Sequence, residues 1–549
     1  MTPSWMHSRA PLLLAAAALA ALRAPVARAP PRAFGDLCRP RQPCWPTAAE
    51  WASLNVSVGG RLAAPAPTGI YAAAAHAQYP NQNCHGPLGT FCADASTYAF
   101  PAFALDAHTP EDVQLAVSFC AKHSIRVSVR TSGHSFLGTS TAADSLLVYV
   151  GSAVNHWMRL EEQFDDGCGG PKVPAVVTGP GVNDGDVYDF VTPRGYLTTA
   201  GHALTVSLNG GYLQGGGLGD MTPLLGLAVD NVLSLDVVTP DGKLRHVTRC
   251  AEPDLWWALR GGGGGTYGVV VGAAHRLHKA PSVVFECNIA WGGTDALAEE
   301  FVEQALRIVP AMAALKTGSF GGGMAPTGYP KSPASYFYLV YLGEDYSEGI
   351  GVLQPLFQWL EEHATNPPRG GVVSLKNHSS YFDYHGNNTD PVGFATIQTG
   401  RLIPPESFVG AGAKAFAQHI VQERVAKGVP FSAQYHVPQG RFMDPGGSSA
   451  VAKHMRRALW NTQQVSGVSP AISAPDWTAQ NTTLERAHAL LEAATPGSGC
   501  YLNECSYWQD DWQQAQWGEN YPRLLELKRR YDPQGLFLCH HCVGSEGLA

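Results

Sequence analysis

Apolar and polar positions alternate most regularly between residues 97 and 280, where they predict short helices and strands that take turns along the chain. Thr109-Pro110-Glu111-Asp112 has the features of a helix start, namely a threonine cap, a proline in the first turn and an acid three residues after the cap. Apolar residues then recur at helical spacing as far as Cys120. Residues 125–129 alternate apolar with polar positions, which predicts a strand.

Further short elements follow in the same region. Strands are predicted at 145–150, 231–239, 244–248 and 269–271, and a short helix at 254–260. The turn Pro240-Asp241-Gly242 joins two of these strands. Helices and strands that alternate in this way favour an α/β or α+β fold.

The pattern changes twice more along the chain. From 281 to 497 glycine-rich loops become rare, and short strands alternate with helices such as 294–308 and 484–494, which indicates a separate substrate-covering domain. We therefore divide the chain into five parts: a leader at 1–29, a Cys/Pro-rich lead-in at 30–96, a first domain at 97–280, a substrate domain at 281–497 and a C-terminal segment at 498–549 that carries its own motifs.

The first 29 residues have the features of a secretory signal peptide. Arg9 supplies a positive start, Leu12 to Leu22 is an apolar run, and Ala27-Arg28-Ala29 is a small-residue cleavage site. An apolar run of this length is too short to span a hydrocarbon core of about 30 Å. We expect a secreted protein that has no membrane contact after the leader is removed.

Composition narrows the class of protein further. Hydrophobic residues make up 45% of the 549 residues, enough for a large core, which excludes disorder over the whole chain. The net charge of −8 provides no basic face for nucleic acid.

The 12 cysteines of a secreted chain predict disulfides. Close pairs are the candidates for local bridges: Cys38/Cys44, Cys84/Cys92, Cys500/Cys505 and Cys539/Cys542. Sequons for N-glycosylation at Asn55, Asn377, Asn387 and Asn481 fit the same compartment.

The run Cys539-His540-His541-Cys542 could also be interpreted as a set of metal ligands. A structural zinc site usually has a second matched pair at a defined distance, and no such pair occurs in the sequence. A disulfide or free thiols are favoured, and we predict no metal site.

Three glycine-rich loops, at 130–138, 209–219 and 261–268, account for the densest glycine runs. Residues 263–268 formally match the dinucleotide motif G-x-G-x-x-G, but a predicted helix precedes them and a β-branched run follows. This is the reverse of the order that a nicotinamide site requires. The other two loops suit either an anion-binding nest for a pyrophosphate or tight turns between strands, and both interpretations stay open.

Ordered motifs at both ends of the chain resemble the FAD-linked oxidases of the vanillyl-alcohol-oxidase/berberine-bridge-enzyme superfamily, with its PCMH-type FAD-binding fold. The motifs are RTSGHSFLGTS (130–140), the glycines at 210–217, Asp230-Asn231-Val232, LDVVTPDG (235–242), DLWWALRGGGGGTYGVV (254–270), Tyr501-Leu502-Asn503 and WGENYPRLLELKRRYDPQGLF (517–537). The leading CWPTAAEWASLN and terminal VGSE segments look most like secreted isoamyl alcohol oxidase-like proteins. The middle, about 281–497, matches weakly.

The resemblance implies an α+β fold. It consists of a PCMH-type FAD-binding domain, made of two α/β subdomains, and a substrate domain in which helices cover an antiparallel sheet.

The resemblance also implies FAD, covalently bound by His134 at its 8α carbon. The remaining cofactor-binding residues that it implies are Arg130, Thr131, Ser132, Gly133, Ser135, Gly138, Gly210, Gly211, Gly215, Gly216, Asn231, Val238 and Asn503. Doubly linked relatives have a cysteine just before the glycine pair. The corresponding stretch here, 201–205, contains none, which implies a single link and a less oxidising flavin. Whether His202 in that stretch has a function stays open, and a packing role is favoured.

Tyr501 is the predicted catalytic base, by its match to the family's Y-x-N motif. An ordinary tyrosine is a poor base near neutral pH, so its pKa would have to be lowered by positive charge or hydrogen bonding. The alternative is that Tyr501 only packs on the ring. Residues that could assist it from the substrate domain are Gln398, Arg401, Tyr435 and His436.

The predicted activity is oxidation of an alcohol or sugar hydroxyl, with O₂ reduced to H₂O₂, by a monomer. Two alternatives are a dehydrogenase with another electron acceptor and a catalytically silent secreted binding protein. Aromatic residues of the middle segment could stack on a sugar or could form the core of a sheet. These residues are Trp291, Tyr336, Tyr338, Tyr381 and Tyr384.

Overall fold

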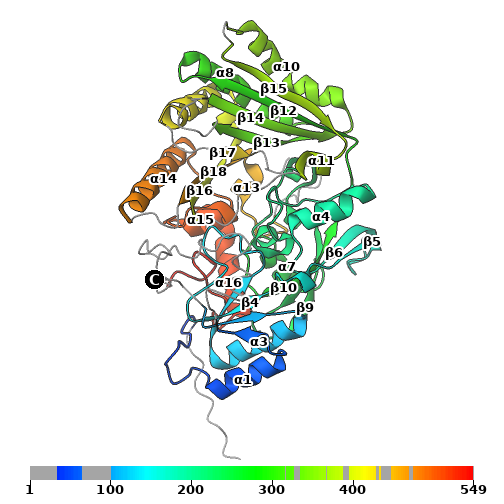
Figure 1. Cartoon of the computed structure of the whole chain (residues 1–549), viewed down its shortest axis with the longest axis vertical. Coiled ribbons are helices and arrows are strands. Elements are labelled where there is room, and N and C mark those ends of the chain that lie inside the picture. Colours follow the sequence, from blue (N-terminus) through cyan, green and yellow to red (C-terminus); the bar gives the residue numbers. More distant parts are fainter. Residues whose placement is uncertain are drawn as a thin grey trace, which may run out of the picture.

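The structure is a computed structural model of the chain, in which helices pack against four sheets (Figure 1). The residues it describes are 34–64, 101–315, 317–326, 334–365, 368–386, 395–427, 432–434, 447–468 and 474–547. The predicted signal peptide, the Cys84/Cys92 pair and the candidates Tyr435 and His436 lie outside these residues.

A four-stranded sheet lies at the lower end in Figure 1, covered by two helices. Its order is β1 (Leu62–Ala63), β2 (Phe103–Asp106), β4 (Ser145–Tyr149) and β3 (Arg126–Arg130), and the helices are α1 (Ala48–Ser57) and α3 (Pro110–His123). The predicted start of α3 is confirmed, because Thr109 accepts from the Asp112 backbone N–H in a capping box. Its apolar stripe is buried in the core beneath the sheet.

A five-stranded antiparallel sheet follows in the chain. Its order is β5 (Met158–Phe164), β6 (Val173–Thr178), β10 (Val269–Arg276), β8 (Val232–Val238) and β9 (Leu244–Val247). Its connections contain α4 (Asp184–Val191), α5 (Thr222–Leu225), α6 (Ala228–Asn231) and α7 (Pro253–Leu259), and β7 (Tyr196–Leu197) pairs with β11 (His278–Lys279). Gly242 has a φ of 75° in the predicted turn between β8 and β9, a conformation that favours glycine.

The seven-stranded antiparallel sheet forms the upper half of the molecule (Figure 1). Its order is β15 (Gly370–His378), β12 (Val283–Gly292), β14 (Ala334–Gly343), β13 (Ser319–Pro326), β17 (Ser432–Gln434), β18 (Trp460–Val468) and β16 (Ala395–Ile403). One face packs against α8 (Ala296–Arg307), α9 (Val309–Ala313), α10 (Tyr346–Glu362), α12 (Gly410–Gln418) and α14 (Ala474–Ala494). Trp291 is a core residue of that face, stacked on Phe301 with ring centroids 5.5 Å apart.

The opposite face of the seven-stranded sheet turns toward the rest of the molecule. Val340, Leu342 and Leu402 from this face share one core with residues of the five-stranded part. Two short helices, α11 (Tyr381–His385) and α13 (Lys453–Arg457), lie at this junction. The predicted α+β class with a helix-covered antiparallel sheet is confirmed.

The C-terminal segment returns to the lower half through α15 (Trp512–Trp517) and α16 (Tyr521–Tyr531). A buried ion pair holds it there, in which Lys528 Nζ lies 2.8 Å from Asp532 Oδ2 with both side chains fully buried. The same ammonium group donates to the carbonyl oxygens of Thr266 and Phe537, each at 2.7 Å. The glycine-rich loop at 261–268 is therefore fastened to the end of the chain.

Four disulfides join described cysteines. Three are predicted pairs, Cys38–Cys44, Cys500–Cys505 and Cys539–Cys542. The fourth, Cys168–Cys250, links residues 82 apart and was not predicted, because the sequence does not show which distant loops meet. Within the described residues, no helix is both long and apolar enough to cross a bilayer.

Candidate active site

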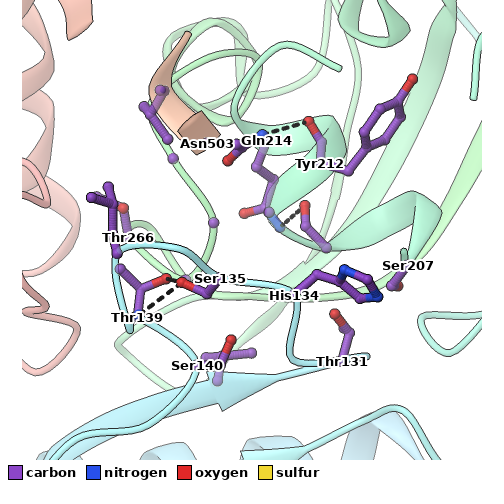
Figure 2. A pocket seen from close by; sticks show the side chains of 18 of the residues that line it. Thr131, His134, Ser135, Thr139, Ser140, Ser207, Tyr212, Gln214, Thr266 and Asn503 are labelled. Atoms are coloured by element: carbon purple, nitrogen blue, oxygen red, sulfur yellow. Dashed lines mark hydrogen bonds between the residues drawn. The ribbon is translucent and has the colours of Figure 1, made fainter. Parts of the chain in front are cut away.

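A deep cavity lies where the three glycine-rich loops meet, with about 940 Å³ of empty space including its open mouth. Figure 2 shows Ser135, Thr139 and Ser140 on one side and Asn503 on the opposite side. The lining comes from the loop after β3, from residues 206–214 and 262–268, from Leu502 and Asn503, and from Trp517 with residues 540–542. Elements far apart in the sequence thus line one cavity.

The loop after β3 is shaped by its own hydrogen bonds. The Thr139 N–H donates to Ser135 Oγ at 2.9 Å, and the two hydroxyls lie 2.8 Å apart. Gly133 has a φ of 91°, and a Cβ there would lie 2.6 Å from the buried Arg130 guanidinium. A side chain at Gly133 would therefore be strained both by its backbone angle and by a clash, so the loop can pass over Arg130 only with glycine at this position.

His134 projects from this loop toward the second one, and its Nε2 lies 3.0 Å from Thr205 Oγ1 (Figure 2). Burial and, after it, the positive charge of Arg130 lower the pKa of His134 to about 3. The imidazole is therefore neutral over the physiological range and keeps a nucleophilic nitrogen lone pair.

The second loop runs through the π-helical turn at Leu208–Tyr212. Asn209 fixes it to β6, because its Nδ2 donates to Thr178 Oγ1 at 2.8 Å and its Oδ1 lies 2.8 Å from His275 Nε2. A Cβ on Gly210 would lie 2.5 Å from Thr131 Oγ1. The first two loops consequently touch through the bare backbone of a glycine.

The third loop, 261–268, is held by the second. The Gly261 and Gly263 N–H groups both donate to the Gln214 backbone oxygen at 3.0 Å, and a Cβ on Gly264 would lie 2.7 Å from the Gly211 Cα. Helix α7 precedes this loop and β10 follows it, which is the order that led us to reject a nicotinamide site.

The Y-x-N motif closes the cavity from the C-terminal side. Asn503 Nδ2 donates to the Tyr501 hydroxyl at 2.6 Å and reaches the Tyr212 backbone oxygen at 3.5 Å. A Cβ on Gly215 would lie 2.6 Å from the Asn503 amide, so this glycine lets the motif approach. The Cys500–Cys505 disulfide encloses the whole motif in one small ring.

Tyr501 is buried, and its pKa is raised, first by burial and then by the carboxylate of Glu504. This is opposite to the shift that a base requires. Glu504 itself has a pKa raised to about 7 by burial, against hydrogen bonds from Asn461 and Gln463 that lower it. The loop therefore carries a carboxyl group that titrates near neutral pH beside a tyrosine that does not.

The sheet face opposite the Y-x-N motif is rich in amides. Asn461 of β18 pairs directly with Leu402 of β16 and with Gln434 of β17. Directly paired residues point to the same face of a sheet, and Leu402 on this face shares a core with Tyr501. Gln398 lies on this side and donates to the Glu504 backbone oxygen at 3.3 Å. Arg401 points away, because its guanidinium donates to Thr495 and Glu492 behind the sheet.

His202 belongs to a hydrogen-bonded cluster where α11 meets the second loop. Its Nδ1 lies 3.1 Å from Asp220 Oδ2, which also accepts from the Tyr381 hydroxyl at 2.9 Å. His385 donates to the His202 backbone oxygen, and the two imidazole rings lie 4.4 Å apart. These contacts tie α11 to the loop.

The cavity contains most but not all of the predicted cofactor-binding residues. Those that line it are Thr131, Ser132, Gly133, His134, Ser135, Gly210, Gly211 and Asn503. Five other predicted residues lie behind this lining or at its edge, namely Arg130, Gly138, Gly215, Gly216 and Tyr501. Asn231 and Val238 do not reach it, since Asn231 is buried with its amide bonded to Thr199, Leu225 and Leu227, and Val238 packs in the core below β8.

Several lining residues were not predicted. His540 and His541 lie at the cavity, where His540 stacks on Tyr507 with centroids 3.7 Å apart and His541 stacks on Trp512 at 5.1 Å. The sequence shows these histidines between two cysteines but not that the tail folds back. Gln214 and Asn209 were also missed, although polar residues between the glycines of 209–219 were the available signal.

The donor set suits a large ligand that carries phosphate. The walls supply hydroxyl groups at Thr131, Ser132 and Ser135, and the glycines form a cradle that side chains would fill. The neutral imidazole of His134 and the amide of Asn503 line the same cavity.

Comparison with known proteins agrees with this geometry. Residues 101–248 match the family model described as an FAD binding domain, and residues 500–544 match the model described as berberine and berberine like. An FAD-linked oxidoreductase of Hypocrea jecorina, sor8, is 30% identical, with 93% of this chain and 91% of that protein covered. The FAD-linked oxidoreductase ZEB1 of Gibberella zeae is 29% identical, with 93% and 92% covered.

Among solved structures, the VAO-type flavoprotein MtVAO615 of Myceliophthora thermophila has a similar fold. The TM-score is 0.79 at 24% identity, with 93% of this chain and 97% of that chain covered. The similarity therefore extends through the middle segment, where sequence motifs are weak.

Proposed function

The chain belongs to the vanillyl-alcohol-oxidase/berberine-bridge-enzyme superfamily of FAD-dependent oxidoreductases, and from this premise we propose that it oxidises a hydroxyl group of an alcohol or carbohydrate. The observation that carries the proposal is the amide- and tyrosine-bearing sheet face set against the Y-x-N motif and the glycine cradle. Such a face offers donors and acceptors to hydroxyl groups, and aromatic rings to the apolar face of a sugar.

FAD fits the cavity, because the lining combines a glycine-walled cradle, hydroxyl donors around His134 and the amide of Asn503. Thr131, Ser132, Ser135 and the backbone of Gly210 and Gly211 would hold it. When bound, FAD supplies the acceptor for the two electrons that leave the substrate carbon as hydride.

His134 is the proposed point of a single covalent link. Its lowered pKa keeps the imidazole neutral, as a nucleophile must be, and its Nε2 lies 3.0 Å from Thr205 Oγ1. Residues 201–205 contain no cysteine for a second link. To test the proposal, the purified protein is denatured and the polypeptide is separated from small molecules. Flavin fluorescence should stay with the polypeptide, and free flavin in the supernatant would refute the link.

Tyr501 is proposed to contact the substrate hydroxyl beside Asn503. It can serve as the base only if cofactor or substrate lowers its pKa, because in the structure burial and Glu504 raise it. Tyr501→Phe should bind flavin normally and lose most of its rate of anaerobic flavin reduction if the phenol takes part in the reaction. Unchanged kinetics would remove Tyr501 from the mechanism.

Tyr336 and Tyr338, whose rings lie 6.5 Å apart on β14, are proposed to face the substrate. Tyr338 is opposite Gly323 on β13, and Gly323 is opposite Gln434 on β17, so an aromatic ring and an amide share this face. Tyr381, by contrast, is buried against Tyr188 and Asp220. A polyol or sugar therefore fits better than an apolar alcohol.

O₂ is proposed as the final electron acceptor, with H₂O₂ as product. The second candidate is a dehydrogenase that passes electrons to another acceptor, and the third is a silent binding protein. Reoxidation in air after anaerobic reduction, with one peroxide formed per substrate, supports the oxidase. Slow reoxidation in air together with rapid reduction of a quinone or dye supports the dehydrogenase. A flavin that no substrate reduces supports the binding protein.

Secretion as a monomer is proposed from the leader, the four disulfides and the sequons. Asn377 is exposed on β15 and suits glycosylation, whereas Asn481 is buried and its amide donates to Glu485 at 2.7 Å. Mass spectrometry of the secreted protein should find glycan at Asn377 and none at Asn481, and a chain that begins after Ala29.

A further inference from the structure

Oxidation of a hydroxyl group releases a proton, and the Y-x-N motif alone does not accept it. The pKa of Tyr501 is raised, and its hydroxyl already accepts the Asn503 amide at 2.6 Å. A second side chain of the same wall is therefore the better candidate for the proton acceptor.

Glu504 follows the motif directly and points into the polar sheet face. Its carboxylate accepts from the Asn461 side-chain amide and from Gln463, both on β18. These two residues alternate with Thr462 and therefore face the same side of the sheet. The carboxylate thus lies between the Y-x-N motif and the side-chain amides of β18.

Two features bring this carboxylate so close to the sheet. Gly400 on β16 lies directly against the Glu504 backbone, where a Cβ would be 2.4 Å from the Glu504 carbonyl oxygen. The Cys500–Cys505 disulfide closes the ring that contains Tyr501, Asn503 and Glu504, and Cys505 lies against the Tyr501 backbone oxygen at 3.2 Å. The carboxylate, the phenol and the amide are therefore held as one rigid unit.

The electrostatic surroundings suit a proton acceptor. The groups that face Glu504 from β16 and β18 are neutral amides and a glycine, and Arg401 of β16 is directed to the other side. The Glu504 carboxylate raises the pKa of the neighbouring Tyr501. With its pKa at about 7, the carboxyl group can both accept and release a proton near neutral pH.

We propose that Glu504 is the catalytic base of the reaction. Its carboxylate takes the proton as the substrate O–H bond breaks, a C=O bond forms, and the electron pair of the substrate C–H bond leaves as hydride to the bound cofactor. Tyr501 and Asn503 then hold the substrate oxygen, and the proton returns to solvent from Glu504. This inference rests on the proposed function.

The test compares Glu504→Gln, Tyr501→Phe and the control Glu519→Gln, in which the altered carboxylate is exposed and pairs with Lys453. Flavin reduction by a substrate of the wild type is followed anaerobically as a function of pH. The wild-type rate should rise through pH about 7 and level off above it, because the base must be ionised. In Glu504→Gln the rise of the rate with pH (the pH limb) should be absent, and the rate should be lower by about 100-fold or more, as expected for loss of general-base catalysis. The control should keep the wild-type rate.

A second variant changes the pKa of the proposed base instead of removing its carboxyl group. The Asn461 amide lowers the pKa of Glu504, so Asn461→Leu should move the limb to higher pH. An infrared titration gives a readout apart from activity. A protonated carboxyl band with a midpoint near pH 7 should appear in the wild type and Tyr501→Phe, and be absent in Glu504→Gln.

The outcomes separate this inference from the proposed function. If no hydroxyl compound reduces the wild-type flavin, the proposed function is wrong, and the role of Glu504 as its base is wrong with it. If the wild type turns over and Glu504→Gln, with normal flavin content, keeps both rate and limb, Glu504 is not the base. A limb that disappears in Tyr501→Phe and persists in Glu504→Gln assigns the base to Tyr501.

Discussion

The buried pair Lys528–Asp532 offers a direct check on how the C-terminal segment holds the cavity. The ammonium group makes three bonds inside the protein, to Asp532 and to the backbone oxygens of Thr266 and Phe537, with no exposure to water. Asp532 in turn accepts from the Leu536 and Phe537 N–H groups at 2.8 and 2.9 Å. Lys528→Met removes the three donors and leaves a buried carboxylate without its cation.

The expected loss of unfolding free energy is about 3–5 kcal/mol, the usual cost of breaking a buried pair on one side. Adding Asp532→Asn to this variant removes the unpaired charge and keeps an oxygen for the backbone donors, so it should recover more than about 1 kcal/mol. Because Thr266 belongs to the third glycine-rich loop, Lys528→Met should also lower the flavin content of the purified protein.

Urea unfolding followed by tryptophan fluorescence measures the first effect, and the ratio of flavin to protein absorbance in the purified variant measures the second. The matched control is Lys453→Met, an exposed lysine paired with Glu519, for which the change should stay below about 1 kcal/mol. A Lys528→Met protein that unfolds at the wild-type urea concentration would refute the claim that this pair fastens the loop.

Three further predictions concern the cavity. Thr205→Val removes the hydroxyl at His134 Nε2 and should slow covalent flavin incorporation, and His134→Ala should abolish it, both measured as fluorescence that stays with the denatured polypeptide. Gly215→Val should displace Asn503 and lower flavin content without loss of circular dichroism, whereas Gly351→Ala, where nothing lies near the added Cβ, should leave flavin content unchanged. Because the folded-state pKa of Glu504 is raised to about 7, its acid form stabilises the fold below the unfolded pKa, and this contribution disappears as the pH rises through 7. Relative to Glu504→Gln, the free energy of unfolding of the wild type should therefore fall by at most about 3 kcal/mol between pH 5 and 9. A difference in unfolding free energy between the two proteins that does not vary with pH would contradict the raised pKa.

Local signals predicted the elements around the cavity well. The Thr109 cap and the apolar stripe of α3 depend on neighbours within one helix, and both are as expected. Helix α14 begins at Ala474, earlier than the predicted 484, because its first turns lack a clear apolar period. Short-range pattern thus predicted the start of α3 well and that of α14 poorly.

The composition of the site depended on contacts between distant segments. Asn231 has the polarity of a cofactor ligand, but its amide donates to Thr199 and to backbone oxygens of the turn that precedes β8. His540 and His541 reach the cavity because the tail packs on Tyr507 and Trp512, a placement that no local pattern encodes. The raised pKa of Glu504 likewise follows from burial against β18, which the sequence YLNEC does not reveal.

The most direct test of the proposed activity is an anaerobic titration of the purified flavoprotein with primary alcohols, monosaccharides and oligosaccharides. At least one hydroxyl compound should bleach the visible absorbance of the flavin, with the best reduction by a polyol or sugar. Admission of air should then restore the absorbance and release H₂O₂. A flavin that dithionite reduces but that no hydroxyl compound in the panel reduces would contradict the proposal.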